Sequence, residues 1–293
     1  MHDDRPSPDD LLREYTRRAR LTVYLAAAAG AGKTRRLVDD ARRLQAAGLR
    51  VVVGRLETKG RPDLDTHASG LSFLPGRRVD VAGGTFEDFD LEAALQLHPD
   101  IVILDELAHA NLPGGINEKA WQDALALREA GIGVIGALNI AHVETVAATA
   151  ERATGRPVRE IVPFSFLQSA DEVIALDISP QLLQRRLRSG KIVAEDDVER
   201  ALSGPFSETS LYALRELLLR TVDQIATATV RAERASFAVA IALPGASLEG
   251  FLRRIAAITG PLDLALHVAA TKGLDRSELR PLVAELHADV LDK

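Results

Sequence analysis

One segment near the N-terminus constrains the fold of this chain more than any other. It reads Ala26-Ala27-Ala28-Ala29-Gly30-Ala31-Gly32-Lys33-Thr34 and lies between an apolar run at 21–26 and a stretch with helical periodicity at 35–47. Gly30 and Gly32 let the backbone turn so that its amide groups face one point, and the following helix adds the positive end of its dipole. A strand, a glycine-containing turn and a helix in this order predict a phosphate-binding loop.

The polar residues of this loop suit the phosphates of a nucleotide. Lys33 is expected to reach the β- and γ-phosphates, and the Thr34 hydroxyl is expected to ligate Mg²⁺. The remaining nucleotide contacts are expected from Gly30, Ala31, Gly32 and Arg35. The consensus for such loops has glycine where this chain has Ala27, a sterically mild change. A tight turn with an incidental lysine is the structural alternative.

A second motif carries the acidic groups that such a site needs. The run 101–104 is apolar throughout, as in a strand buried on both faces, and it ends in Asp105 and Glu106. At the carboxyl end of a central parallel strand, Asp105 would reach Mg²⁺ through water and Glu106 would polarise an attacking water. Asn139 follows a later strand, where it would sense the γ-phosphate or cap the next helix. Together with the phosphate loop, this motif predicts an NTPase fold.

The rest of the chain alternates between strand-like and helical segments, which predicts a P-loop NTPase-type α/β fold, a mostly parallel sheet flanked by helices. Strands are expected at 21–26, 51–54, 79–81, 101–104, 133–138, 160–163 and 172–176, and helices at 35–47, 87–97, 121–130, 141–153, 181–188 and 207–233. Further strands at 237–243 and 262–268 and helices at 248–259 and 276–287 predict a small second α/β unit. The expected organisation is a polar extension at 1–19, a P-loop domain at 20–232 and a partial unit at 233–293.

Composition excludes several classes of function. The 293 residues contain no cysteine, which removes disulfides, thiolate metal sites and cysteine nucleophiles and fits a reducing compartment. Aromatic residues make up 4% of the chain and the net charge is -6, so no nucleic-acid surface is expected. No apolar run is long enough to cross a membrane, and the polar N-terminus lacks the pattern of a signal peptide. These features predict a cytoplasmic protein.

A series of short motifs occurs between the phosphate loop and the helix at 207–233. They are Gly30-x-Gly32-Lys33-Thr34, Val52-Val53-Gly54, Glu57-Thr58-x-Gly60-Arg61, Phe89-Asp90, Asp105-Glu106-Leu107-Ala108-His109-x-Asn111-x-Pro113-Gly114, Lys119-x-Trp121-Gln122-Asp123, Leu138-Asn139, His142, Thr154-Gly155, Ala170-Asp171-Glu172-Val173, Gly190-Lys191 and Ala213-Leu214-Arg215-Glu216-Leu217. Over about residues 20 to 232, the chain resembles the N-terminal cytoplasmic P-loop module of the KdpD-type osmosensitive potassium sensor kinases. The tail from Arg234 resembles the start of the universal-stress-protein-like domain that follows this module in the family.

The resemblance implies a nucleotide-dependent regulatory switch in potassium-transport (osmotic) signalling, with ATP and Mg²⁺ as cofactors. It implies Lys33 and Thr34 as phosphate and Mg²⁺ contacts, Asp105 as the acid near the metal, and Glu57 and Arg61 as neighbours of the site. Nucleotide and Mg²⁺ would order the loops at 57–61 and 109–114. The implied protein partner is the remainder of a sensor kinase, a response regulator or a transporter, and a homodimer is left open.

Three positions depart from the family pattern, and they bear on hydrolysis of the nucleotide rather than on its binding. The family has glycine, proline and histidine at positions 26, 29 and 59, where this chain has Ala26, Ala29 and Lys59. Binding of the nucleotide is expected to survive these changes, whereas its hydrolysis is left open. The sequence also does not separate a stand-alone module from a fragment of a longer sensor kinase.

An enzyme is the alternative function for the same residues. In that interpretation the site hydrolyses ATP or transfers its γ-phosphate to a protein hydroxyl of the serine or threonine type, with Glu106 or Glu57 as the base. A loop kept only for folding stability is a third alternative. The sequence contains no dimerisation helix with a phosphoacceptor histidine and no kinase ATP-lid glycines, so a histidine-kinase core is not expected in this chain.

Overall fold

The computed structural model describes residues 19–58, 60–81, 83–190, 192–193, 195–233, 237–241, 266–270 and 289–291. The chain divides into two compact units, Met1–Asp223 and Gln224–Lys293. Outside the described residues lie nearly all of the expected extension, the expected helices at 248–259 and 276–287, and the family positions Lys59 and Lys191. The domain boundaries expected at 19 and 232 stay predictions.

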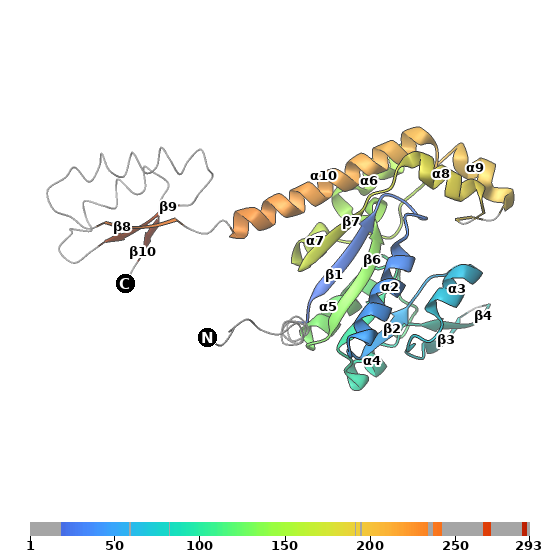
Figure 1. Ribbon diagram of the computed structural model, residues 1–293, viewed down its shortest axis with the longest axis horizontal. Coiled ribbons are helices and arrows are strands. Elements are labelled where there is room, and N and C mark those ends of the chain that lie inside the picture. Colours follow the sequence, from blue (N-terminus) through green and yellow to red (C-terminus); the bar gives the residue numbers. More distant parts are fainter. Residues whose placement is uncertain are drawn as a thin grey trace, which may run out of the picture. The chain divides into compact units, whose positions relative to one another are not determined.

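A parallel five-stranded sheet organises the first unit (Figure 1). Its strands, in spatial order, are β2 (Val51–Arg55), β5 (Ile101–Leu104), β6 (Gly133–Asn139), β1 (Leu21–Ala26) and β7 (Glu172–Leu176). Every pairing between these neighbours is parallel. Because the carboxyl ends of parallel strands share one edge, the loops that follow β1, β2, β5 and β6 meet there. The predicted α/β fold with a mostly parallel sheet is confirmed.

Helices cover both faces of this sheet, and every residue of β1 and β5 is buried. The helices are α2 (Lys33–Ala46), α3 (Pro62–Ala68), α4 (Leu91–Leu97), α5 (Ala120–Glu129), α6 (Glu144–Thr154), α7 (Phe164–Ser169), α8 (Pro180–Arg188), α9 (Val198–Leu202) and α10 (Glu208–Glu233), with short 3-10 turns η1 (Ile140–His142) and η2 (Glu195–Asp197). Among the residues that the structure describes, no helix combines the length and apolar character needed to span a bilayer.

The helix α2 holds the phosphate loop against the sheet. Its buried residues Leu37, Val38, Ala41 and Leu44 recur at helical spacing and join one cluster with side chains of β1, β2, β5 and β6. Alternation along the strands sends one set of side chains into this cluster and the other set to the opposite face. The start of α2 is thereby fixed at the carboxyl edge of the sheet.

One buried hydroxyl in this cluster makes stability depend on alkaline pH. Tyr24 is 3% exposed, donates a hydrogen bond to Asp40 and accepts one from Arg36 Nε at 3.1 Å. Burial and the hydrogen bond to Asp40 raise the pKa of Tyr24 to about 12, from an ordinary value of 10.0. The folded chain therefore keeps this proton longer than the unfolded chain, so the stabilisation is complete below about pH 10 and is lost as the pH rises to about 12.

The expected loss is about 2 to 3 kcal/mol in the free energy of unfolding between those pH values. Denaturant titrations at several pH values from about 9 to 12 measure it. Tyr24→Phe lacks the ionisable group and should show a flatter pH dependence over this interval. Equal slopes for the two proteins would contradict the assignment to Tyr24.

A hairpin replaces the first turn of one expected helix. Residues 84–88 form β4 (Gly84–Asp88), which pairs antiparallel with β3 (Arg77–Val81), so the helix expected from 87 begins at Leu91. The side chain of Asp90 accepts a hydrogen bond from the Ala93 amide and caps that helix. The prediction of helix at 87–90 was wrong because the cap at Asp90 starts the helix later and Phe86 pairs across the hairpin with Val79.

A second expected element is reduced to a single bridge. The strand predicted at 160–163 is represented only by the pairing of Val162 with Val143. Pro163 follows directly and has no amide hydrogen to extend a ladder. The prediction of a sheet strand at this position was therefore wrong, and α7 begins right after Pro163.

In the second unit, the described strands that follow α10 form a parallel sheet. Its order is β10 (Asp289–Leu291), β9 (Leu266–Ala270) and β8 (Phe237–Ile241). The strands predicted at 237–243 and 262–268 are found, the second displaced toward the C-terminus. The likeness to a universal-stress-protein domain stays a prediction.

Candidate functional site

The loop between β1 and α2 has the backbone that the sequence predicts. Gly30 and Gly32 have φ angles of +83° and +102°, in the left-handed region that favours glycine, and Gly32 occupies the N-cap of α2. A Cβ atom added to Gly30 would lie 2.2 Å from Ile192 Cδ1, so a side chain there would also displace the end of Ile192. Lys33 is the first residue of α2, where the amide groups have no partner within the helix.

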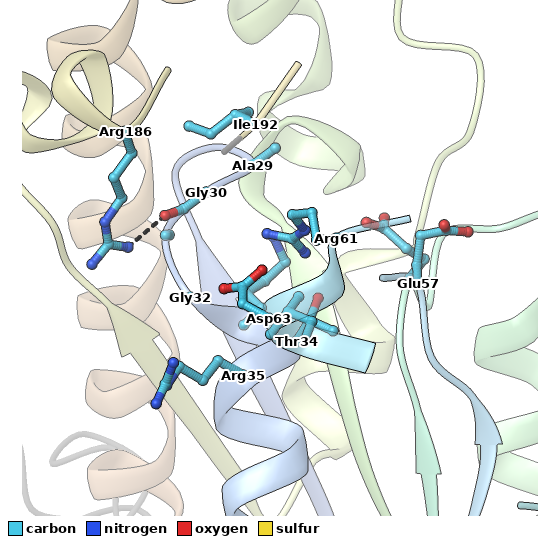
Figure 2. A pocket seen from close by; sticks show the side chains of 14 residues that line it. Ala29, Gly30, Gly32, Thr34, Arg35, Glu57, Arg61, Asp63, Arg186 and Ile192 are labelled. Atoms are coloured by element: carbon cyan, nitrogen blue, oxygen red, sulfur yellow. Dashed lines mark hydrogen bonds between the residues drawn. The ribbon is translucent and has the colours of Figure 1, made fainter. Parts of the chain in front are cut away.

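A pocket of about 250 Å³ opens at this end of α2 (Figure 2). It is lined by the predicted residues Gly30, Ala31, Gly32, Lys33, Thr34, Arg35, Glu57, Arg61 and Glu106, together with Ala29, Asp63, Leu64, Arg186 and Ile192. Its cationic side chains are Lys33, Arg35, Arg61 and Arg186. A concave site with several cations beside a helix N-terminus suits a polyanion.

Two side-chain oxygens of the kinds that bind Mg²⁺ in proteins lie beside each other next to this pocket. Thr34 Oγ1 donates a hydrogen bond of 2.7 Å to Asp105 Oδ2, and Asp105 is fully buried. Burial and the nearby Glu106 raise the pKa of the Asp105 carboxyl, whereas Lys33 and the Thr34 hydroxyl oppose the rise. A hydroxyl and a carboxylate are the oxygen donors that Mg²⁺ takes in nucleotide sites.

The small number of protein oxygens here agrees with a metal ion whose other ligands are phosphates and water. Within the described part of the chain, no three His, Asp or Glu side chains form a cluster that could hold a metal ion alone. Mg²⁺ in nucleotide sites is bound through one or two protein oxygens, with phosphates and water as the other ligands. Thr34 and Asp105 therefore fit Mg²⁺ delivered with a nucleotide.

Asn139 contacts the lysine of the loop. Lys33 Nζ lies 2.5 Å from Asn139 Oδ1, and Asn139 pairs in register with Ala26 at the ends of β6 and β1. The Asn139 side chain makes no capping hydrogen bond to the turn η1 that follows it. The Asn139 side chain thus contacts the lysine that is expected to bind phosphate, and it does not cap the following turn.

The two adjacent carboxylates after β5 lie in different surroundings. Glu106 has a φ angle of +54°, a backbone conformation that residues other than glycine seldom adopt. Its amide donates a hydrogen bond of 3.0 Å to Asp105 Oδ1. This turn leaves Asp105 fully buried while Glu106 lines the pocket. Backbone strain of this kind is often found at functional sites, and nothing in the sequence announces it here.

The loop after β2 brings the remaining predicted residues to the pocket. The Glu57 amide approaches Asp105 Oδ2 at 3.4 Å, and Arg61 Nε donates to the Thr58 carbonyl at 2.9 Å. Both side chains line the pocket. The carboxylate of Asp105 therefore touches the loop of Glu57 as well as the hydroxyl of Thr34.

A buried ion pair fixes the loops around the site, and the sequence does not reveal it. Asp88 on β4 pairs with Arg55, two residues before Glu57, and the two side chains are 2% and 14% exposed. Asp88 Oδ2 also accepts a hydrogen bond of 2.6 Å from the Leu112 amide, in the loop that follows Glu106. The Asp88 carboxylate thus connects the hairpin to the loop that carries Glu57 and to the loop that carries Glu106.

The pocket wall also contains residues that were not predicted from the sequence, and two of them, Arg186 and Ile192, come from far along the chain. Arg186 on α8 donates from Nη1 to the Gly30 carbonyl at 2.6 Å, and Ile192 packs against Gly30. The sequence shows only a basic cluster, with Arg185 and Arg188 in the same last turn, which usually marks a solvated helix face. No local pattern distinguishes Arg186 from these two.

The comparison with known families decides the membership of the chain. The family described as the osmosensitive K⁺ channel His kinase sensor domain, KdpD, matches residues 17–225. The chain belongs to the KdpD family. The matched range contains every residue that lines the pocket.

Curated relatives in this family are much longer than the matched segment. The sensor protein KdpD of Escherichia coli K12 is 42% identical over 224 residues, which cover 75% of this chain and 25% of that protein. The sensor protein KdpD of Mycobacterium tuberculosis H37Rv is 41% identical over 210 residues, 71% and 24% of the two chains. A KdpD sensor protein of Synechocystis is 40% identical over 206 residues, 70% and 56%. The match therefore spans about a quarter of the first two relatives and just over half of the third.

Proposed function

We propose that this chain is a regulatory module of the KdpD type that binds ATP and Mg²⁺ in the cytoplasm and acts as a nucleotide-dependent switch in potassium-transport signalling. The observation that carries the proposal is that Lys33 and Thr34 line one pocket at the carboxyl edge of the sheet while the buried Asp105 accepts a hydrogen bond from Thr34 directly beside it. These residues come from two elements far apart in sequence and supply the cation, hydroxyl and carboxylate that Mg-ATP requires.

The contacts of Asp105 support a switching role. Asp105 Oδ2 accepts hydrogen bonds from the Thr34 hydroxyl and the Glu57 amide, so a metal ion that bound this oxygen would change how the loop after β2 is held. A γ-phosphate would likewise compete with Asn139 for Lys33. A bound Mg²⁺ would neutralise phosphate charge, and the loops at 57–61 and 109–114 would respond to its arrival.

The partner we propose is a component of potassium signalling, in keeping with a family described as an osmosensitive K⁺ channel His kinase sensor domain. It is the remainder of a sensor kinase, a response regulator or a transporter, and a homodimer of this chain is a further candidate. The nucleotide-dependent loops are the surface through which such a partner would distinguish the two states.

A second candidate function is an ATPase or a phosphotransferase acting on a protein hydroxyl. It is favoured by Glu106, whose left-handed backbone turns it into the pocket that Glu57 also lines. Phosphate release, or transfer of label from γ-labelled ATP to a signalling protein, tests it. A rate in the wild-type chain no higher than in Lys33→Ala would exclude the enzyme, whichever of Glu106 and Glu57 is the base, and would leave the switch as the function.

Titration calorimetry with a non-hydrolysable ATP analogue tests the binding proposal. The wild-type chain is expected to bind one analogue in the presence of Mg²⁺ and to bind it more weakly in EDTA, because Thr34 and Asp105 would then lack the ion that bridges them to the phosphates. If no heat of binding were measured with Mg²⁺ present, at analogue concentrations up to the millimolar range, the proposal would be refuted.

A further inference from the structure

The two ends of the pocket differ in chemistry. On one side, Thr34 and the Glu57 and Glu106 amides all donate hydrogen bonds to Asp105, and Glu57 lies on that side in Figure 2. Arg186 lies on the opposite side of the loop, beside Gly30. If Lys33 and Thr34 hold the β- and γ-phosphates, the rest of the nucleotide extends away from them. The nucleoside would then reach the end formed by Arg186.

Arg186 is held in place from two directions. Its Nη1 donates to the Gly30 carbonyl at 2.6 Å and would lie 3.9 Å from a Cβ atom on Gly32. Its helix is anchored by the buried Leu183 and Leu187. Within the described residues, Arg186 forms no ion pair with a carboxylate, so its charge is not neutralised by the protein there. The guanidinium is thus a positioned planar cation in the pocket wall.

Apolar side chains pack against the same glycine whose carbonyl Arg186 contacts. Ile192 lines the pocket, and both Ile192 and Leu183 contact the position where a Gly30 side chain would be, at 2.2 and 3.6 Å from its Cβ. A planar guanidinium and an aliphatic side chain that line one pocket around the same glycine suit the flat face of an aromatic ring system, through cation–π attraction and apolar contact. A phosphate would gain from the charge but not from Ile192.

We propose that Arg186 and Ile192 form the nucleoside subsite of this pocket, where the guanidinium stacks on a purine base. The inference rests on the proposed binding of Mg-ATP and adds the residues that recognise the base. The subsite would favour purine triphosphates over a triphosphate chain that carries no base.

Calorimetric titrations with Mg²⁺ and either ATP or inorganic tripolyphosphate separate base recognition from phosphate binding. Arg186→Met is expected to weaken binding of ATP about tenfold, the loss of about 1.4 kcal/mol that a desolvated cation–π contact supports. Binding of tripolyphosphate should change by less than about threefold. Arg185→Met is the matched control, because it removes the same charge from the exposed face of the same helix and should leave both affinities unchanged.

Each outcome has one meaning. An equal loss for ATP and tripolyphosphate would show that Arg186 serves the phosphates or the loop, and it would overturn the inference, as would an unchanged affinity for ATP. Wild-type chain that binds tripolyphosphate as tightly as ATP would also overturn it while the phosphate site stands. Wild-type chain that binds neither would refute the proposed function itself.

A second variant covers the case in which Arg186→Met melts well below the wild type without nucleotide. Arg186→Lys keeps the charge but lacks the planar group, so it should still bind ATP several-fold more weakly than wild type, with tripolyphosphate unaffected. Full ATP affinity in this variant would overturn the stacking role.

Discussion

Lys33→Ala is expected to lower the affinity for Mg-ATP about a hundredfold, the largest effect on binding of any single change in the pocket. Lys33 is 6% exposed, and its ammonium group lies at the start of α2, where it would pair with phosphate away from bulk water. Loss of a hydrogen bond between charged groups in such surroundings costs about 1.5 to 3 kcal/mol, and 2.7 kcal/mol corresponds to about a hundredfold. Calorimetric titration of both proteins measures the ratio.

The next residue but one supplies the control for this variant. Arg35 also lines the pocket, but it is exposed to solvent. Arg35→Ala therefore removes a cation with a much smaller loss of binding free energy. Its effect on Mg-ATP affinity should stay below about tenfold. An affinity of Lys33→Ala within threefold of wild type would mean that the loop does not bind the phosphates as we propose.

Asp88→Asn is expected to lower the free energy of unfolding by about 3 to 5 kcal/mol, because it leaves Arg55 charged and buried without its partner. The two side chains are 2% and 14% exposed, and Asp88 also accepts the Leu112 amide. The change therefore removes support from the hairpin and from the loop after Glu106. Urea unfolding of both proteins, with two-state analysis, measures the difference.

The same hairpin offers a matched control. Arg78 and Glu87 form an ion pair whose side chains are 80% and 66% exposed, so water already solvates both charges. Glu87→Gln should change the free energy of unfolding by less than about 1 kcal/mol. Equal losses for Asp88→Asn and Glu87→Gln would show that burial of the Arg55 pair contributes nothing to stability.

The parts of the fold that the sequence predicts correctly are those with strong local patterns. The run at 101–104 is apolar on both faces and is a central strand, and the spacing of Leu37, Ala41 and Leu44 marks α2. The hairpin of β3 and β4 was missed because its pairing is a contact between segments, whereas the acidic run before Leu91 alone resembles the first turn of a helix. Propensity over a few residues cannot choose between these outcomes.

The candidate site shows the same division. Lys33, Thr34, Asp105 and Asn139 follow strands or begin a helix, so strand order alone brings them to one edge. Arg186 reaches Gly30 across 156 positions of sequence and comes from a helix whose other arginines face solvent. Such a contact depends on the packing of α8, which no local pattern specifies.

Hydrogen exchange with Mg²⁺ and a non-hydrolysable ATP analogue tests the switch most directly. We expect amides in peptides covering 57–61 and 109–114 to exchange more slowly when the wild-type chain is saturated, because bound metal and phosphate would order these loops. Lys33→Ala under the same conditions should exchange as the nucleotide-free chain does. Unchanged exchange in both peptides of a wild-type chain shown by calorimetry to be saturated would contradict the proposal that nucleotide binding switches these loops.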